Sequence, residues 1–210
     1  MGTTKRLAWF VFAFLAIGVS LYPLLYVNYA FQEGEFGIRL SKSEELLANT
    51  LWNIGFYGHV VFGGIALATG WAQFSKKIRR KRLQLHRNLG KVYVGAALIS
   101  GACGVGIGFL ATGGWIPALG FILLGLVWLY TTFSAYLAIR KKDLNLHEGM
   151  MIYSYAACFA AVTLRLWLPL LQITLGDFLI AYNIVAWLCW VPNIIFASVL
   201  VKKKRLLFID

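Results

Sequence analysis

Apolar residues run along this chain in long stretches and do not alternate with polar ones. Six stretches cover residues 7–29, 51–74, 89–111, 115–138, 149–171 and 178–201, and they are interrupted mainly by Gly, Ser, Thr, Tyr and Trp. A helix needs about 20 apolar residues to cross a hydrocarbon core about 30 Å thick. Strands of a membrane β-barrel would alternate over about ten residues, which these stretches do not. The pattern therefore predicts an all-α integral membrane protein, a bundle of six transmembrane helices.

The composition supports this class and leaves little room for a soluble domain. Of the 210 residues, 60% are hydrophobic and 13% are charged, and the mean hydropathy is +0.72. An ordinary soluble domain is about half apolar and a quarter charged. We expect a single transmembrane domain over residues 1–210. The first stretch follows Lys5 and Arg6 and is longer than the apolar core of a secretory signal, so it is predicted to be a retained helix.

The net charge of +12 is distributed unevenly, and the distribution predicts the topology. If the six helices alternate in direction, 17 of the 20 basic residues fall on one side of the membrane. The other side has Arg39 and Lys42 beside Glu33, Glu35, Glu44, Glu45 and Asp177. The positive-inside rule then places both termini in the cytoplasm and the 31–50 segment outside. The basic loop suits anionic membrane lipids as partners. It has no recognition module or stacking aromatics for nucleic acid.

One basic residue lies inside the membrane by this topology. Arg165 is about 9 Å from the outer boundary, and His59, on the second helix, is about 12 Å from it. An intramembrane arginine is costly unless it snorkels, pairs or faces a cavity. Small residues line the same helix faces as His59, Arg165, Tyr182 and Asn193, which indicates packing faces. We expect an outer polar site built from His59 and Arg165 with aromatic neighbours such as Trp52, Tyr57, Trp167 and Tyr182. Arg165 should point into the bundle with His59 as its first partner, and Asn193 is a further candidate that lies deeper toward the cytoplasm. The alternative is that Arg165 snorkels to lipid phosphates and His59 bonds a backbone carbonyl.

The other two histidines are predicted at the cytoplasmic rim, where His86 precedes the third helix and His147 precedes the fifth. His59 would then lie roughly 18 Å or more away, which excludes a single three-histidine metal centre. Two histidines on separate helices can ligate one haem, with Gly90 allowing close approach and Arg87 holding a propionate. Both histidines could equally be interfacial or capping residues. The three cysteines lie in apolar interiors without C-x-x-C spacing, so no disulfide or zinc site is predicted.

Several segments resemble a known family, the predicted bacterial membrane proteins of domain of unknown function 2306. The resemblance covers roughly residues 50–200. It rests on His59-Val-Val-Phe-Gly-Gly, Trp71-Ala-Gln-Phe, His86-Arg-Asn-Leu-Gly90, Tyr130-Thr-Thr-Phe, Val162-Thr-Leu-Arg165-Leu and Trp187-Leu-Cys-Trp190-Val-Pro-Asn193. The resemblance implies a multi-pass protein of the bacterial inner membrane and carries no established activity.

The layout is more distantly similar to transmembrane cytochromes b, in which core helices supply paired haem ligands. His86 and His147 would correspond to one such pair. The fourth helix, 115–138, contains no histidine, so His59 has no partner for a second haem. Three classes stay open. The first is a redox protein with haem b that passes electrons to a quinone or redox partner. The second is a non-redox binder or transporter of an anionic, quinone or lipid-like ligand. The third is an assembly or scaffold subunit.

Overall fold

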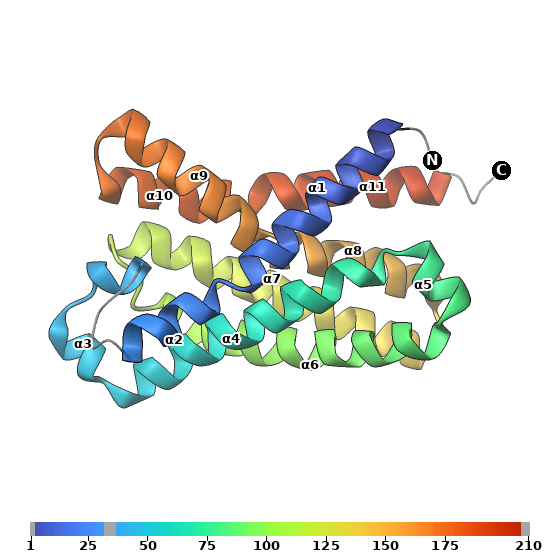
Figure 1. Ribbon diagram of the computed structural model, residues 1–210, viewed down its shortest axis with the longest axis horizontal. Helices are drawn as coiled ribbons and strands as arrows, with labels where there is room; N and C mark the ends of the chain where they lie inside the picture. The colour runs from blue at the N-terminus through green and yellow to red at the C-terminus, as the bar shows by residue number, and fades with distance from the viewer. Residues whose placement is uncertain (1–2, 32–36, 207–210) are drawn as a thin grey trace. The chain divides into compact units, whose positions relative to one another are not determined.

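The computed structural model describes residues 3–31 and 37–206 and confirms the all-α class (Figure 1). Six segments are long and apolar enough to cross a membrane: Arg6–Tyr26, Thr50–Gln73, Leu83–Gly108, Trp115–Arg140, Leu144–Leu175 and Phe178–Lys203. Each overlaps with one of the six predicted helices. The described residues contain no strand. The chain divides into two compact units, Met1–Ser100 and Gly101–Asp210, and each unit is described by itself.

The first span is made of two helices where the sequence predicted one. Helix α1 covers Thr3–Ser20 and α2 covers Pro23–Phe31. Pro23 has no backbone N–H and its ring excludes a regular helix just before it, so the chain bends there. Gly64 on the next span lies against this bend, because a Cβ at Gly64 would be 2.9 Å from both Pro23 Cγ and the Ser20 carbonyl oxygen. The absence of a side chain at Gly64 thus lets the bend pack closely on α4 (Thr50–Gln73).

The predicted outer segment folds into short helices before α4. A 3₁₀ helix, η1, covers Gly37–Ser41, and α3 covers Glu44–Ala48. The Asn49 side chain caps α4 by accepting a 2.9 Å hydrogen bond from the Trp52 N–H. Burial lowers the pKa of the Lys42 ammonium in this segment. The predicted outer residues Glu33 and Glu35 lie outside the described residues.

The basic loop after α4 is partly helical, which the sequence analysis did not predict. Helix α5 covers Lys76–Lys81, and Ser75 caps it by accepting from the Ile78 N–H at 3.4 Å. Helix α6 covers Leu83–Gly108, so the predicted start at residue 89 was wrong. His86 therefore lies within the first turn of α6 and does not precede the helix. The error arose because the charged first turns of a membrane helix extend beyond its apolar run.

The second unit holds the remaining helices: α7 (Trp115–Arg140), α8 (Leu144–Cys158), α9 (Ala160–Leu175), α10 (Phe178–Leu188) and α11 (Val191–Leu206). Helices α7 and α8 pack along each other as an antiparallel pair, α10 packs on α7 and α9, and α11 packs on α8 (Figure 1). The predicted start of the fifth helix at residue 149 was also wrong. Asp143 caps α8 at its true start, where its Oδ1 accepts from the Leu146 N–H at 2.9 Å. His147 thus lies in the first turn of α8.

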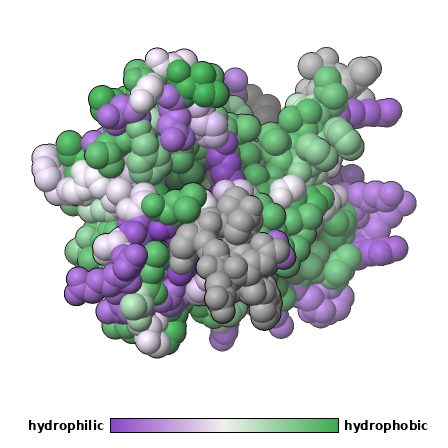
Figure 2. All heavy atoms as spheres, turned by 60° about the vertical axis from the view of Figure 1, so that its left-hand side comes forward, coloured by the Kyte–Doolittle hydropathy of each residue, from purple (hydrophilic) through white to green (hydrophobic). Residues whose placement is uncertain are grey.

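The predicted small-residue faces are the packing faces. On α4, Ala66 is fully buried and Gly70 is buried. On α8 and α10, Ser154 and Ala186 are completely buried. Many large apolar side chains elsewhere are exposed, and Figure 2 shows them covering broad parts of the surface. Exposed apolar helix faces of this extent are expected where lipid is the solvent.

Candidate functional site

His147 is held by a backbone carbonyl of the neighbouring helix. Its Nδ1 lies 2.9 Å from the carbonyl oxygen of Ala135 on α7. A carbonyl only accepts hydrogen bonds, so Nδ1 must carry the proton in this contact. In the neutral ring the lone pair then resides on Nε2. The half-buried His147 is therefore fixed in the tautomer that coordinates a metal through Nε2.

His86 has a different environment within the first unit. The side-chain amide nitrogen of Gln73 donates to His86 Nδ1 at 3.0 Å and to its carbonyl at 3.2 Å, while the Gln73 amide oxygen accepts from the Gly90 N–H at 3.2 Å. In this arrangement Nδ1 is an acceptor, so Nε2 carries the proton of the neutral ring. Gly90, predicted to allow a cofactor close, lies against Gln73. Arg87 is exposed beside it.

His59 links α4 to α6 by two reciprocal bonds. Its Nδ1 lies 3.0 Å from the carbonyl oxygen of Ser100, and the Ser100 hydroxyl donates to the carbonyl of His59 at 2.8 Å. The same hydroxyl lies 3.2 Å from His59 Nδ1. Gly63, one turn on, leaves room for this contact, because a Cβ there would be 3.1 Å from Ser100 Oγ. His59 thus bonds a backbone carbonyl, which the sequence analysis gave as the alternative to a ligand role.

Arg165 is half-buried on α9 and its Nη1 donates to the carbonyl of Ala161, one turn earlier, at 2.7 Å. The Nε atom of Arg165 is buried as well. Pro169, inside the same helix, lacks the N–H that would otherwise bond the Arg165 carbonyl. Arg165 and His59 belong to different units, so their predicted pairing stays a prediction.

Asn193 connects two spans of the second unit. One span is made of α8 and α9, and the other is made of α10 and α11. Its Nδ2 lies 3.3 Å from the carbonyl of Ala156, 2.9 Å from the carbonyl of Cys189 and 3.1 Å from Thr163 Oγ1. The Thr163 hydroxyl itself donates to the Cys189 carbonyl. Pro192 has no N–H for the Leu188 carbonyl four residues earlier, so the helical ladder is interrupted beside Cys189. The amide nitrogen of Asn193 therefore holds the interruptions of the two spans together.

Tyr182 packs among aromatic rings of the second unit. Only 7% of its surface is exposed, and its ring centroid lies 5.3 Å from those of both Phe121 and Phe178. This contact gives Tyr182 a place in the core. Its predicted role in an outer ligand site stays a prediction.

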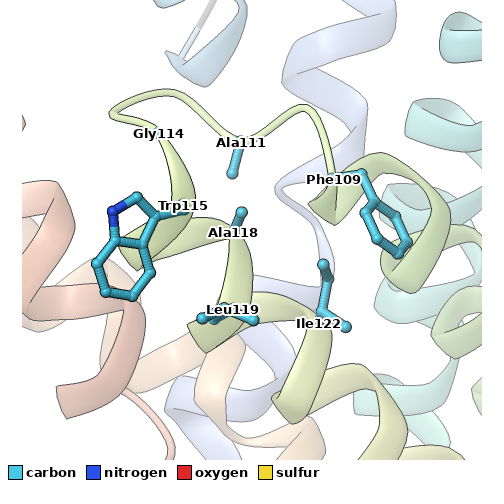
Figure 3. A pocket seen from close by; sticks show the side chains of 7 residues that line it. All are labelled: Phe109, Ala111, Gly114, Trp115, Ala118, Leu119 and Ile122. Carbon is cyan, nitrogen blue, oxygen red and sulfur yellow. The ribbon is translucent and has the colours of Figure 1, made fainter.

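Surface hollows in the second unit are apolar. One of about 410 Å³ lies at the turn between α6 and α7, and Figure 3 shows Phe109 and Trp115 at its two edges with Ala118 between them. Another of about 520 Å³ is lined by Trp187 and Pro192 among others. Neither includes a predicted site residue. Within residues 3–31 and 37–206, no group of three or more His, Cys, Asp or Glu side chains is placed to hold a metal ion.

Two polar residues that contribute to these contacts were not singled out from the sequence, Ser100 and Thr163. Ser100 is completely buried, and Thr163 is half-buried. The sequence does place both hydroxyl groups on membrane helices, where serine and threonine side chains can hydrogen-bond to a neighbouring helix. Because serine and threonine also bond their own helix, as Thr69 does to Ile65, this placement alone could not identify them.

Six spanning segments, a charge distribution with one basic side and lipid-suited surfaces define a multi-pass membrane protein. Residues 56–201 match the family model described as "Predicted membrane protein (DUF2306)". The match covers more than half of the chain, and the chain belongs to this family. No curated protein and no solved structure matches the chain, so the distant similarity to cytochromes b has no support from these comparisons.

Proposed function

We propose that this protein binds one b-type haem near its cytoplasmic side and transfers electrons in the bacterial cytoplasmic membrane. The observation that carries the proposal is the contact of His147 Nδ1 with the Ala135 carbonyl. Histidines that ligate metals usually donate their other ring N–H to a carbonyl or carboxylate, which fixes the ring and raises the basicity of the ligating nitrogen. His147 meets this requirement with its Nε2 available to iron.

His86, which belongs to the first unit whereas His147 belongs to the second, is the proposed second axial ligand, and this role requires a change at its ring. The Gln73 amide has to turn so that its oxygen accepts from His86 Nδ1, because only then does Nε2 hold the lone pair. The turn gives up the bond from the Gly90 N–H to Gln73 and places the amide oxygen 3.2 Å from the His86 carbonyl oxygen, so haem binding has to offset this loss. The cofactor, when bound, would supply one-electron redox chemistry. Gly90 and Arg87 are the proposed neighbours of the macrocycle and a propionate.

Absorption spectra of variants at the three histidines test this proposal. His147→Asn keeps a donor near the position of Nδ1 for the Ala135 carbonyl but has no counterpart of Nε2. We expect it to fold and to lose the Soret band. His86→Ala should also lose the low-spin spectrum. His59→Asn is the matched control. It should keep the low-spin spectrum, since His59 bonds the Ser100 carbonyl and is not a proposed haem ligand. Full haem content in His147→Asn would overturn the proposal.

A second candidate is a binding site for an anionic group, such as a lipid phosphate or a quinone oxygen, at Arg165. A half-buried guanidinium inside a predicted span supports it, because a charged group within the membrane is costly unless it pairs or faces a polar cavity. Arg165→Lys keeps the charge and should retain co-purifying anionic lipid better than Arg165→Gln. Equal lipid content in both variants and the unaltered protein, measured by native mass spectrometry, would remove this candidate.

A further inference from the structure

Three aromatic rings of α4 lie close to the guanidinium of Arg39, a residue of the predicted outer segment of the first unit. The ζ carbon of Arg39 lies 5.5 Å from the ring centroid of Trp52 and 5.6 Å from those of Phe56 and Tyr57. The face of an aromatic ring is electronegative, and a cation within about 6 Å of its centroid is attracted to it. Arg39 thus lies against an aromatic cage, defined here as Trp52, Phe56 and Tyr57, in which at most one ring of the stacked Trp52–Phe56 pair turns its face to the guanidinium.

The cage is built by the first turns of α4. Trp52 and Phe56 lie one turn apart and stack, with centroids 5.1 Å apart and planes at 15°, and Tyr57 meets Phe56 edge-on at 5.3 Å. Tyr26 of α2 supports Phe56 from another side at 5.0 Å. Gly37 has φ +62° and brings η1 close, since a Cβ there would be 2.6 Å from the Tyr26 hydroxyl. The rings are therefore held in place by packing that does not involve Arg39.

Two polar groups lie beside the rings, the side-chain amide of Asn53 and the indole N–H of Trp52. Asn53 Oδ1 accepts from Arg39 Nη1 at 2.7 Å, and the Asn53 amide nitrogen is oriented by the Leu47 carbonyl at 2.6 Å. Trp52 is 5% exposed, and its Nε1 is buried without a hydrogen-bond partner. Arginine carries donors only, so Arg39 offers no acceptor to this N–H. Buried donors of this kind are usually satisfied.

We propose that the aromatic cage is a binding site for an organic cation that carries an oxygen acceptor, an alkylammonium group of the choline type, and that Arg39 is its built-in competitor. Recognition of quaternary ammonium groups is a known use of such cages. The oxygen would meet the unsatisfied Trp52 N–H, which Arg39 does not. This site is independent of the proposed haem, because all its residues lie in the outer end of the first unit.

Because Arg39 competes with a free cation for the aromatic cage, binding of the cation is best measured in a variant that lacks the guanidinium. Arg39 lies eleven residues before Thr50, the first residue of α4, so its effective concentration at the cage is high and a free cation should bind the unaltered protein weakly. Removal of the guanidinium leaves the rings in place, because Tyr26 and the stacking within α4 hold them. Arg39→Gln should therefore open the cage without dismantling it.

Calorimetric titration of the full chain in non-ionic detergent tests the proposal. We expect Arg39→Gln to bind choline saturably and at least about tenfold more tightly than the unaltered protein. Tetramethylammonium, which lacks the oxygen, should bind less tightly than choline. The neutral isostere 3,3-dimethylbutan-1-ol should not bind. A short-chain phosphatidylcholine, titrated in parallel, separates a lipid headgroup from a free cation as the source. No saturable binding of choline to folded Arg39→Gln, or equal binding of the neutral isostere, would overturn the proposal.

Two further variants keep the test decisive. Tyr57→Leu in the Arg39→Gln background removes one ring and should weaken choline binding, whereas Tyr130→Leu, at an exposed tyrosine of α7, should leave it unchanged. If Arg39→Gln does not fold, Arg39→Lys replaces it, because a single ammonium cannot reproduce the planar contact of arginine and competes less well. Unchanged choline affinity in Arg39→Lys or in the Tyr57 variant would contradict the proposed site.

Discussion

His59 and Ser100 bond each other reciprocally, ring nitrogen to carbonyl oxygen and hydroxyl to carbonyl oxygen, and so fasten α4 to α6. Ser100→Ala removes the hydroxyl bond and leaves the ring contact. We expect it to lower the free energy of unfolding by about 0.5–1.5 kcal/mol, the usual net worth of one hydrogen bond. Thermal unfolding in detergent measures the loss. Ser198→Ala is the control, because Ser198 bonds the Ile195 carbonyl in its own helix. Equal effects of both changes would contradict a linking role.

The bonds among Asn193, Thr163 and the Cys189 carbonyl predict a non-additive pair of substitutions. Asn193→Leu and Thr163→Val should each destabilise the fold by about 1–2 kcal/mol. Their double variant should lose less than the sum by at least about 0.5 kcal/mol, since residues of one network are coupled. Thr174→Val serves as the control, because the Thr174 hydroxyl donates to the Leu170 and Leu171 carbonyls of its own helix. Additive effects in a chemical denaturation series would show that the two residues act separately.

Close packing of α7 on α10 predicts that Gly120 tolerates no larger residue. A Cβ at Gly120 would be 2.8 Å from the Ala186 carbonyl oxygen, which belongs to the backbone and cannot move freely. Gly120→Leu should cost about 1–3 kcal/mol, the range for overpacking. Gly106→Leu provides the comparison, because nothing lies within 4 Å of its Cβ position. Similar melting temperatures for the two variants would contradict this packing.

The predicted orientation rests on the 17 basic residues that alternating spans would place on one side of the membrane, and it can be tested with two fusions. A periplasm-active reporter placed after residue 45 should be active, and the same reporter at the C-terminus should be inactive. Activity at both positions, or at neither, would contradict the predicted topology of six spans with both termini cytoplasmic.

The spans and their packing faces could be predicted from the sequence because lipid imposes length and apolarity on every helix. The division of three spans into shorter helices was harder to predict. Pro192 indicated a loosened helix beside Asn193, and the structure confirms an interruption there. Pro169 lies within α9 without ending it. The interruption at Phe159 has no proline and coincides with the bond from Asn193 to the Ala156 carbonyl.

For the candidate sites, the sequence predicted which residues take part and how deep they lie in the membrane, but not their hydrogen-bond partners. The sequence identified His59 and His147 but not the carbonyls of Ser100 and Ala135 that fix their rings, because backbone acceptors leave no mark in a sequence. The aromatic cage could be predicted only in part, because Trp52 and Tyr57 were expected beside the outer site but the approach of Arg39 to their rings was not. Arg39 comes from a segment outside the spans, and its approach to Trp52 depends on how that segment folds back on α4.

The haem content of the unaltered protein tests the central proposal most directly. The chain would be produced with an ample haem supply, purified in mild detergent and assayed by the pyridine haemochrome method against the protein concentration. Ligation by His147 and His86 predicts about one haem b per chain and a reduced spectrum typical of two histidine ligands. A ratio near zero in folded protein would contradict it.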